Sequence, residues 1–276
     1  MTILGFQNLI LSWHRTNKRS MPWRKTNDPY KILVSEVMLQ QTQAARVIPK
    51  YKEFLKQFPA LSSLAKTSNK KLLRAWRGLG YWRRAKYLKQ TAQILVRAKA
   101  MNLQTPSDLE TLPGIGPYTA RALACFAFGN TEAFLDTNIR RTYLHFFFKN
   151  KKNVPDKEIL KIAQRAIDSL PKKITPREWH YALFDYGALV LKDKEINKQS
   201  KHYAKQSKFK GSFRSFRARI MHMILTQNQN KISQAMLQRF LRHELKKEKS
   251  SWSANDIISS LLKDGLLKKS RGAYSL

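Results

Sequence analysis

The stretch DPYKILVSEVMLQQTQ, residues 28–43, carries most of the information about the fold. Asp28 before Pro29 is a typical helix start, because aspartate caps free backbone N–H groups and proline fits the first turn. The residues that follow are apolar on almost every side, which predicts a buried helix over about 30–39. Glu36 is the exception in that helix. Burial would raise its pKa and suit it to general acid catalysis, whereas an arginine partner or a place at the helix edge is the structural alternative.

Helical patterns also dominate the rest of the chain, and each is bounded by Pro, Gly, Asn or Ser. Up to residue 191 we expect helices at about 47–57, 69–77, 83–99, 107–112, 117–128, 138–149, 156–169 and 176–191. The next stretch, 192–211, is rich in lysine and short of core residues, which indicates a linker. These patterns predict an all-α fold.

The C-terminal part predicts a separate small domain. Helical patterns at 213–225, 231–246 and 254–264 are followed by the turn Arg271-Gly272 between apolar flanks, a hairpin signal. Three helices followed by a hairpin resemble a winged helix. We therefore expect a winged-helix-like domain at the end of the chain.

Composition indicates a polyanionic partner. The chain has 53 Lys and Arg against 18 Asp and Glu, a net charge of +35, and 11% aromatic residues. Such an excess with interleaved aromatics favours nucleic acid, although a general basic bias of the host proteome would give the same charge. The single cysteine, Cys125, excludes an internal disulfide framework, a thiolate cluster and a zinc finger, and indicates a reducing compartment. Apolar runs are too short for a membrane span, and no membrane partner is expected.

Two further motifs have residue types suited to a site. Asp136 in FLDTNIRR, residues 134–141, stands where a helix cap is expected, and it is either an ordinary cap or a carboxylate fixed at a helix start. The run LPGIGPYTA, residues 112–120, makes a tight turn that opens onto a helix. Backbone N–H groups at such a turn can hold a phosphate, although a lone Gly-x-Gly is weak evidence and this one is no dinucleotide fingerprint.

Taken together, these motifs resemble the MutY-type adenine DNA glycosylases of the helix-hairpin-helix superfamily. The resemblance covers about residues 6–191 and rests on PWR at 22–24, DPY at 28–30, SEVMLQQTQ at 35–43, GLGY at 78–81, the hairpin 112–120, Leu135-Asp136 with Asn138, and Gly187-Ala188. The run 35–43 is specific to the family, whereas the hairpin is shared by the whole superfamily.

The resemblance implies a two-lobed, all-α glycosylase fold with a cleft. Its domain would cover residues 1–200, with a six-helix part at about 24–135, followed by a basic linker at 201–210 and the winged-helix-like domain at 211–276. The target nucleotide would be flipped out of the duplex. Glu36 would then protonate adenine at N7, and Asp136 would stabilise the oxocarbenium-like sugar before water attacks.

Other positions carry over from the family residue by residue. The base pocket would include Arg19, Trp23, Arg24, Leu39, Tyr118 and Tyr181. DNA contacts would include Gln41, Thr42, Tyr81, Gly114, Ile115, Gly116 and Asn138, with Lys268, Lys269 and Arg271 as further contacts in the C-terminal domain. Tyr81 would wedge into the duplex, with a core tyrosine as the structural alternative. Tyr118 stands where bifunctional relatives carry lysine, so no strong strand-cleaving activity is expected.

The chain departs from the family at three places. It lacks the four cysteines expected after Val190, so we expect no iron–sulfur cluster and no other cofactor. Tyr181 replaces the usual Glu or Gln near adenine. About 66 residues follow Lys210, which is too few for the Nudix-like domain that recognises 8-oxoguanine.

These departures leave several functions open. The leading hypothesis is a cytoplasmic, nucleoid-associated monomer that acts on double-stranded DNA with a mismatched or oxidised base pair and removes adenine opposite 8-oxoguanine or guanine. A thymine or uracil mismatch glycosylase is the main alternative, because such enzymes share Tyr118 and the Asp-Thr-Asn arrangement at 136–138. A non-catalytic DNA-binding protein and a basic ribosome-associated protein are the others.

Overall fold

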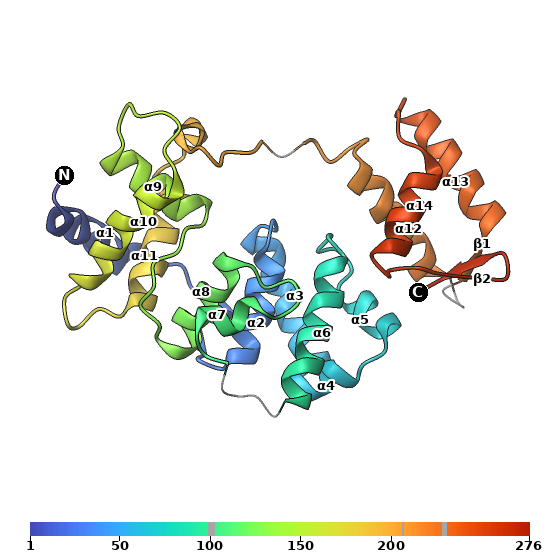
Figure 1. The fold of residues 1–276 in the computed structure, drawn as a ribbon, viewed down its shortest axis with the longest axis horizontal. Coiled ribbons are helices and arrows are strands. Elements are labelled where there is room, and N and C mark those ends of the chain that lie inside the picture. The colour runs from blue at the N-terminus through green and yellow to red at the C-terminus, as the bar shows by residue number, and fades with distance from the viewer. Residues whose placement is uncertain (99–102, 206, 228–230) are drawn as a thin grey trace. The chain divides into compact units, whose positions relative to one another are not determined.

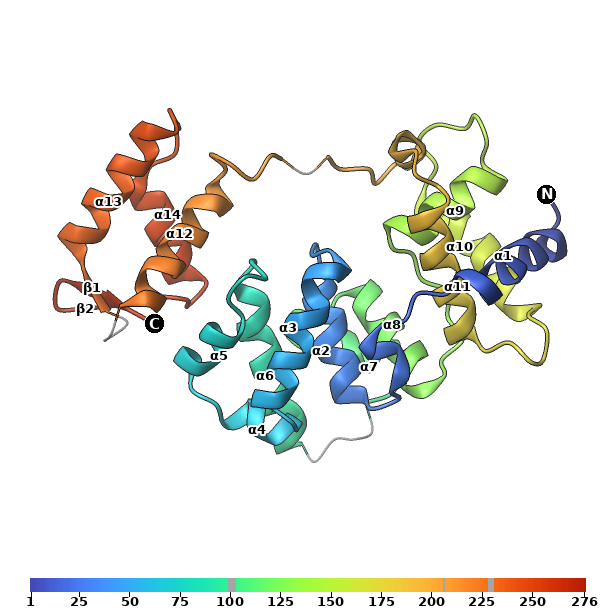
Figure 2. The ribbon, with the colours of Figure 1, turned by 180° about the vertical axis from the view of Figure 1, so that it is seen from behind.

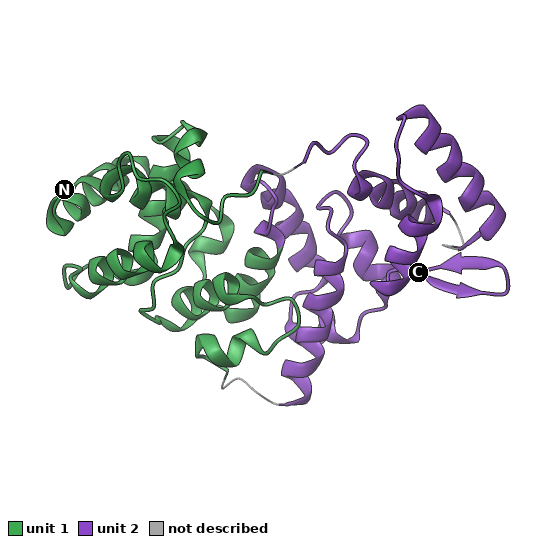
Figure 3. Cartoon of the chain, turned by 45° about the horizontal axis from the view of Figure 1, so that its top comes forward, with its two compact units in different colours: residues 1–37, 101–205 green, residues 38–100, 206–276 purple. Residues whose placement is uncertain are grey.

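The computed structural model describes residues 1–98, 103–205, 207–227 and 231–276. Helices make up most of these residues, with one small sheet near the C-terminus (Figure 1). The chain divides into unit 1, residues 1–37 and 101–205, and unit 2, residues 38–100 and 206–276 (Figure 3). The all-α prediction is confirmed, while the expected domain limits stay a prediction. In the described ranges, every helix is too short or too polar to cross a membrane.

Unit 1 packs around a cluster of aromatic side chains. Its elements are α1 (Ile3–Asn17), η1 (Pro22–Lys25), most of α2 (Pro29–Leu39), α7 (Pro106–Glu110), α8 (Pro117–Phe128), α9 (Thr137–Phe147), α10 (Asp156–Asp168), α11 (Pro176–Leu189) and η2 (Lys194–Gln199). Phe6, Tyr143 and Trp179 are fully buried. The ring centroid of Phe6 lies 5.3 Å from that of Tyr143 and 5.5 Å from that of Trp179. These three rings join α1, α9 and α11, which lie together in both ribbon views (Figures 1 and 2).

Side-chain caps fix where the helices of unit 1 begin. Asp28 Oδ1 accepts a hydrogen bond from the Tyr30 backbone N–H at 2.9 Å, so the start predicted for α2 is confirmed. Thr175 Oγ1 accepts one from the Glu178 N–H at 3.1 Å and starts α11. Such caps satisfy donors that have no partner inside the helix.

Unit 2 has two hydrophobic clusters. Its elements are α3 (Ala44–Gln57), α4 (Leu61–Lys66), α5 (Asn69–Ala75), α6 (Arg83–Arg97), α12 (Phe213–Thr226), β1 (Lys231–Ser233), α13 (Gln234–Lys247), α14 (Ala254–Lys263), β2 (Lys268–Ser270) and β3 (Ala273–Ser275). In the first cluster the Phe54 ring lies 4.8 Å from Phe58 and 5.9 Å from Trp76. In the second, Phe216, Leu237 and Leu261 are fully buried between α12, α13 and α14.

The C-terminal segment has the order expected of a winged helix. Its three strands form an antiparallel sheet in the order β1-β3-β2, with Ile232 opposite Tyr274. Arg271 and Gly272 connect β2 to β3 with φ angles of 38° and 74°. Two left-handed residues make the turn that suits a tight hairpin. The predicted hairpin and the three helices before it are confirmed.

Two sequence predictions about local structure are wrong. Residues 231–233 were expected to begin a helix, but they form β1, because Ile232 pairs with β3 and Ser233 caps α13 by accepting from the Met236 N–H. The linker expected at 192–211 contains η2 at Lys194–Gln199.

Buried polar contacts hold η2 in place. Asn197 is only 8% exposed, and its Oδ1 accepts a hydrogen bond from Arg141 Nε at 3.1 Å. Arg141 Nη1 also donates to the carbonyls of Gly187 and Leu191, each at 3.0 Å. The sequence pattern did not predict η2, because this segment is held by the buried Arg141 guanidinium and not by apolar core residues.

Gly187 lets α11 approach α9 closely. A Cβ atom at this position would lie 2.8 Å from the carbonyl carbon of Asn138 and 2.9 Å from Thr142 Oγ1. Both neighbours belong to α9, and the carbonyl is backbone that cannot rotate away. The first turn of α9 therefore depends on the missing side chain of Gly187.

Replacing Gly187 with alanine should destabilise the protein by about 1–3 kcal/mol, because the added methyl group forces α9 and α11 apart. Thermal unfolding of the Gly187→Ala variant measures this. Gly5→Ala in α1 is the control, since its Cβ would meet only the Thr2 hydroxyl, at 3.1 Å. Equal melting temperatures for Gly187→Ala and the wild type would contradict the close approach.

Candidate active site

Glu36 of α2 is a buried carboxyl group, only 4% exposed. Tyr118 of α8 donates a hydrogen bond from its hydroxyl to Glu36 Oε2 at 3.3 Å. The pKa of Glu36 is raised to about 7, mainly by burial; the Tyr118 hydrogen bond and the charge of Arg24 act to lower it, and the charge of Asp136 acts to raise it. The carboxyl group is therefore half protonated near neutral pH, as the sequence predicts.

Asp136 caps α9 and also lies in the electrostatic field of Glu36. Its Oδ1 accepts from the backbone N–H groups of Asn138 and Ile139 at 2.9 and 2.7 Å. Its Oδ2 accepts from Asn138 Nδ2 at 2.9 Å. Burial raises the pKa of Asp136 above its usual range, although these three hydrogen bonds favour the ionised form. The helix-cap interpretation is correct, and it does not exclude a second role.

The two carboxyl groups differ in hydrogen bonding. Asp136 accepts three hydrogen bonds from groups that can only donate, whereas Glu36 accepts one from the Tyr118 phenol. Hydrogen bonds to the charged form favour ionisation. When one proton is shared between the two groups, it belongs on Glu36.

Tyr118 is a neutral phenol at the second position of α8. Burial raises its pKa well above the ordinary value, and the charges of Glu36 and Asp136 raise it further. Its ring packs edge-on against Phe134, with centroids 5.7 Å apart. It can orient Glu36 by its hydrogen bond, but it cannot act as an amine nucleophile.

The predicted tight turn before α8 is present. Gly114 has a φ of 74°, and the Ile115 N–H donates to the Leu112 carbonyl at 3.1 Å. Gly116 is the N-cap residue of α8, and a Cβ there would meet nothing within 4 Å. No atom in the described part of the protein occupies the space beside Gly116, so a ligand backbone can approach it.

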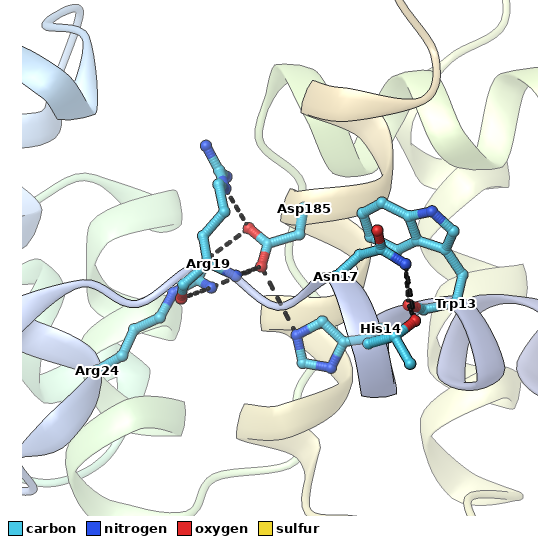
Figure 4. A network of polar contacts seen from close by, with 7 residues as sticks. Trp13, His14, Asn17, Arg19, Arg24 and Asp185 are labelled. Atoms are coloured by element: carbon cyan, nitrogen blue, oxygen red, sulfur yellow. Dashed lines mark hydrogen bonds and ion pairs between the residues drawn. The ribbon is translucent and has the colours of Figure 1, made fainter.

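Asp185 is a site residue that sequence reasoning missed. Its side chain has no exposed area, and it accepts hydrogen bonds from Arg19 Nε at 2.5 Å, the Arg19 N–H at 3.0 Å, and Arg24 Nη1 and Nη2 at 2.7 and 2.9 Å (Figure 4). His14 Nε2 lies 3.6 Å from the same carboxylate. Burial alone would raise the pKa of Asp185, but the nearby His14 ring and the hydrogen bonds from Arg24 hold it well below its ordinary value.

Through Asp185, two predicted pocket residues are fixed in unit 1. Arg24 follows the buried Trp23 in η1, and its guanidinium carbon lies 4.4 Å above the Tyr181 ring. Burial raises the pKa of Tyr181 to about 12, so it stays neutral. The only sequence signal for Asp185 was an acidic residue on the otherwise apolar face of α11.

The remaining predicted site residues belong to unit 2. Leu39 ends α2, and Gln41 and Tyr81 have left-handed φ angles of 55° and 45°. Tyr81 is half-buried, and its hydroxyl accepts from Arg214 Nη1 at 2.5 Å, so the core-tyrosine alternative is wrong. In the hairpin, Lys268, Lys269 and Arg271 are exposed. Thr42 Oγ1 accepts from Arg84 Nη2 at 3.1 Å.

The residues present do not fit an iron–sulfur cluster. Cys125 is the one cysteine of the sequence, and it is buried in α8 with its Sγ 3.7 Å from His180 Nδ1. Burial raises the pKa of its thiol to about 12. Within the described ranges, no three His, Cys, Asp or Glu side chains are grouped so that they could hold a metal ion.

Replacing Asp185 with asparagine should destabilise unit 1 by about 3 kcal/mol at neutral pH, because buried cations lose their counter-charge. Because the pKa of Asp185 is lower in the folded protein than in the unfolded chain, its ionised form stabilises the folded state at pH values above the unfolded pKa of 3.8. This stabilisation is lost progressively as the pH falls below 3.8. Chemical denaturation of wild type and Asp185→Asn from pH 3 to 7 should therefore show a difference that shrinks below about pH 4. Asp168→Asn, an exposed carboxylate on α10, is the control. A constant difference at every pH would contradict this account.

Comparison with known proteins agrees with the fold and the motifs. Residues 34–168 match the model of the HhH-GPD superfamily base excision DNA repair proteins. The adenine DNA glycosylase of Buchnera aphidicola subsp. Baizongia pistaciae is 36% identical over 192 residues, covering 69% of this chain and 54% of the relative. That of Mycobacterium tuberculosis is 38% identical over 185 residues, covering 66% and 60%. The chain thus spans somewhat more than half the length of these relatives.

A solved structure gives the same result for the fold. A thermostable thymine-DNA glycosylase superposes with a TM-score of 0.61 at 28% identity, covering 68% of this chain and 87% of the other. The predicted family is therefore confirmed. The chain belongs to the HhH-GPD superfamily of base excision DNA repair proteins and, within it, is similar to the adenine DNA glycosylases.

Proposed function

We propose that the protein is a monofunctional DNA glycosylase that hydrolyses the N-glycosidic bond of adenine in mispaired double-stranded DNA. The observation that carries this proposal is the pair formed by Glu36 and Asp136. One carboxyl group has a pKa of about 7, and its neighbour is held by three hydrogen bonds. One neutral acid beside one hydrogen-bonded carboxylate is the arrangement that glycoside hydrolysis needs.

Glu36 supplies the proton in this proposal. Adenine is a poor leaving group as an anion, and protonation at N7 lets it depart neutral. The proton of Glu36 moves to N7 while the bond between the sugar and N9 breaks, and the bonding electrons stay with the base. Because the pKa of Glu36 is about 7, a large fraction of the enzyme carries this proton at neutral pH.

Asp136 stabilises the cation left on the sugar. Its carboxylate is held at the start of α9 by Asn138 and Ile139, so its position does not depend on a flexible rotamer. The negative charge faces the oxocarbenium-like sugar until water attacks the anomeric carbon and loses a proton. Tyr118 offers no amine, so a covalent imine and strand cleavage are not expected.

DNA binding follows from the charge and the hairpin. The net charge of +35 favours a polyanion, and a Cβ at Gly116 would meet nothing within 4 Å, which leaves room for a phosphate beside that backbone. Glycosylases must also extrude the target nucleotide, because its bond is inaccessible inside the stack. The partner is therefore duplex DNA with a mispaired or oxidised base. The opposite base is 8-oxoguanine or guanine in this proposal.

A thymine or uracil mismatch glycosylase is the second candidate. A thymine-DNA glycosylase is among the similar solved structures, at 28% identity. The neutral phenol of Tyr181, with a pKa of about 12, does not by itself select adenine. Adenine is preferred because the two curated relatives described above are adenine DNA glycosylases with 36% and 38% identity.

The two candidates are separated by incubating the protein with labelled A:8-oxoguanine, A:G, T:G and U:G duplexes and then cleaving abasic sites with alkali. We expect excision of adenine only. Glu36→Gln should slow single-turnover excision about 10²–10⁴-fold, since it cannot donate the proton. Asp136→Asn should also be severely impaired, whereas Asp168→Asn, which changes an exposed carboxylate on α10, should not be.

Three outcomes contradict the proposal in different ways. Excision of thymine or uracil alone would favour the second candidate. An unchanged excision rate in Glu36→Gln would show that Glu36 is not the proton donor. Duplex binding without excision by wild type would identify a non-catalytic DNA-binding protein.

A further inference from the structure

Arg84 of α6 is a buried arginine, 8% exposed, whose side chain donates to backbone carbonyls at the end of α2. Nη1 donates to the carbonyl oxygens of Met38 and Gln40 at 2.9 and 2.5 Å. Nη2 donates to Thr42 Oγ1 at 3.1 Å. The guanidinium therefore covers the C-terminal carbonyls of a helix, where a positive charge is favourable.

The same guanidinium also holds a second loop. Nη2 donates to the carbonyl oxygens of Leu79 and Gly80 at 3.0 and 3.2 Å. The Trp76 indole N–H donates to the Gly80 carbonyl as well, at 3.1 Å. The Arg84 guanidinium carbon lies 5.5 Å from the Trp76 ring and 5.4 Å from the Tyr81 ring. One side chain thus connects the 39–43 loop with the 77–82 loop.

Both loops contain unfavourable backbone conformations. Gln41 and Tyr81 have φ angles of 55° and 45°, in the left-handed region that non-glycine residues rarely adopt. Gly78 and Gly80, at 93° and 71°, share that region without steric cost. Strained residues persist only where the surrounding structure holds them. The hydrogen bonds of Arg84 to both loops supply that constraint.

We infer that Arg84 is a positioning residue that fixes the 39–43 and 77–82 loops together, so that Gln41 and Tyr81 are presented to DNA in one geometry. This inference rests on the proposed function, because it assigns the two loops to nucleotide extrusion. Arg84 touches neither base nor phosphate in it. Its planar fork reaches five acceptors at once, which a lysine ammonium cannot do.

Arg84 is buried although the burial of a charged group is unfavourable unless polar partners compensate it. Desolvation lowers the pKa of Arg84 to about 10, so the group is still charged at neutral pH. The carbonyl dipoles of Met38, Gln40, Leu79 and Gly80 compensate this buried cation. Of the five acceptors described above, the Met38 carbonyl lies at the end of α2 and the other four belong to the two loops.

The test compares Arg84→Lys and Arg84→Met with Leu88→Ala. Leu88 lies one turn further along α6 and is 1% exposed, so its truncation destabilises the same helix while the Arg84 side chain is kept. Three properties are measured: thermal unfolding, amide hydrogen exchange of the free protein, and single-turnover excision from an A:8-oxoguanine duplex. A duplex with 2-aminopurine beside the target adenine reports extrusion by its fluorescence.

We expect both Arg84 variants to exchange faster in peptides covering 38–43 and 77–82 and to lose the fluorescence rise. Excision should slow roughly tenfold to a hundredfold, because small misplacements at a reacting centre have effects of this size. Leu88→Ala, at a similar loss of melting temperature, should show neither change. Arg84→Lys keeps the positive charge, but we expect it to restore neither the slow exchange of the two loops nor the fluorescence rise.

The opposite results would overturn the inference. Exchange in the two loops equal to that of Leu88→Ala, or full rescue by lysine, would exclude Arg84 as the fork that positions them. If wild type excises no base from any duplex, the proposed function fails, and unaltered loop exchange in the Arg84 variants would separately refute the positioning role.

Discussion

Glu36 sits on a helix with almost no polar surface, and the loss of hydration raises its pKa to about 7. The burial of α2 causes that shift, and the charge of Asp136, which caps α9, adds to it, whereas the hydrogen bond from Tyr118 limits it. The Asp136 carboxylate is stabilised by the same N–H groups that begin α9. Helix capping and the proposed catalytic placement of Asp136 therefore depend on one interaction, and the close approach of Gly187 holds α9 in place.

The basic residues are of two kinds, which the net charge alone does not distinguish: arginines that bind groups inside the protein and lysines that are exposed. Arg24 is bound to the buried Asp185, and Arg84 and Arg141 bind backbone carbonyls inside their own units. These guanidinium groups hold loops and helix ends, and they contribute little surface to a polyanion. Lys268 and Lys269 are basic residues of a second kind, because they are exposed on the hairpin. Electrostatic attraction to DNA should come mainly from residues of the second kind.

Sequence reasoning predicted the features that depend on local patterns. Asp28 and Asp136 predict helix starts, and the apolar run around Glu36 predicts a buried helix. Arg271-Gly272 predicts a hairpin turn. It missed Asp185, Arg84 and η2. Each has a partner far away along the chain: Arg24 is 161 positions from Asp185, Met38 is 46 from Arg84, and Arg141 is 56 from Asn197. Periodicity and capping rules describe neighbours along a helix and carry no information about such pairs.

The central claim is that a neutral Glu36 donates the proton that releases the base. The most direct test is the pH dependence of single-turnover adenine excision by wild type and by Tyr118→Phe. The rate constant should fall tenfold per pH unit above about pH 7, because only the protonated form of Glu36 is active. Tyr118→Phe removes a hydrogen bond that lowers this pKa, so its decline should begin at higher pH. A rate independent of pH between 6 and 8.5, or a decline that Tyr118→Phe leaves in place, would contradict the claim.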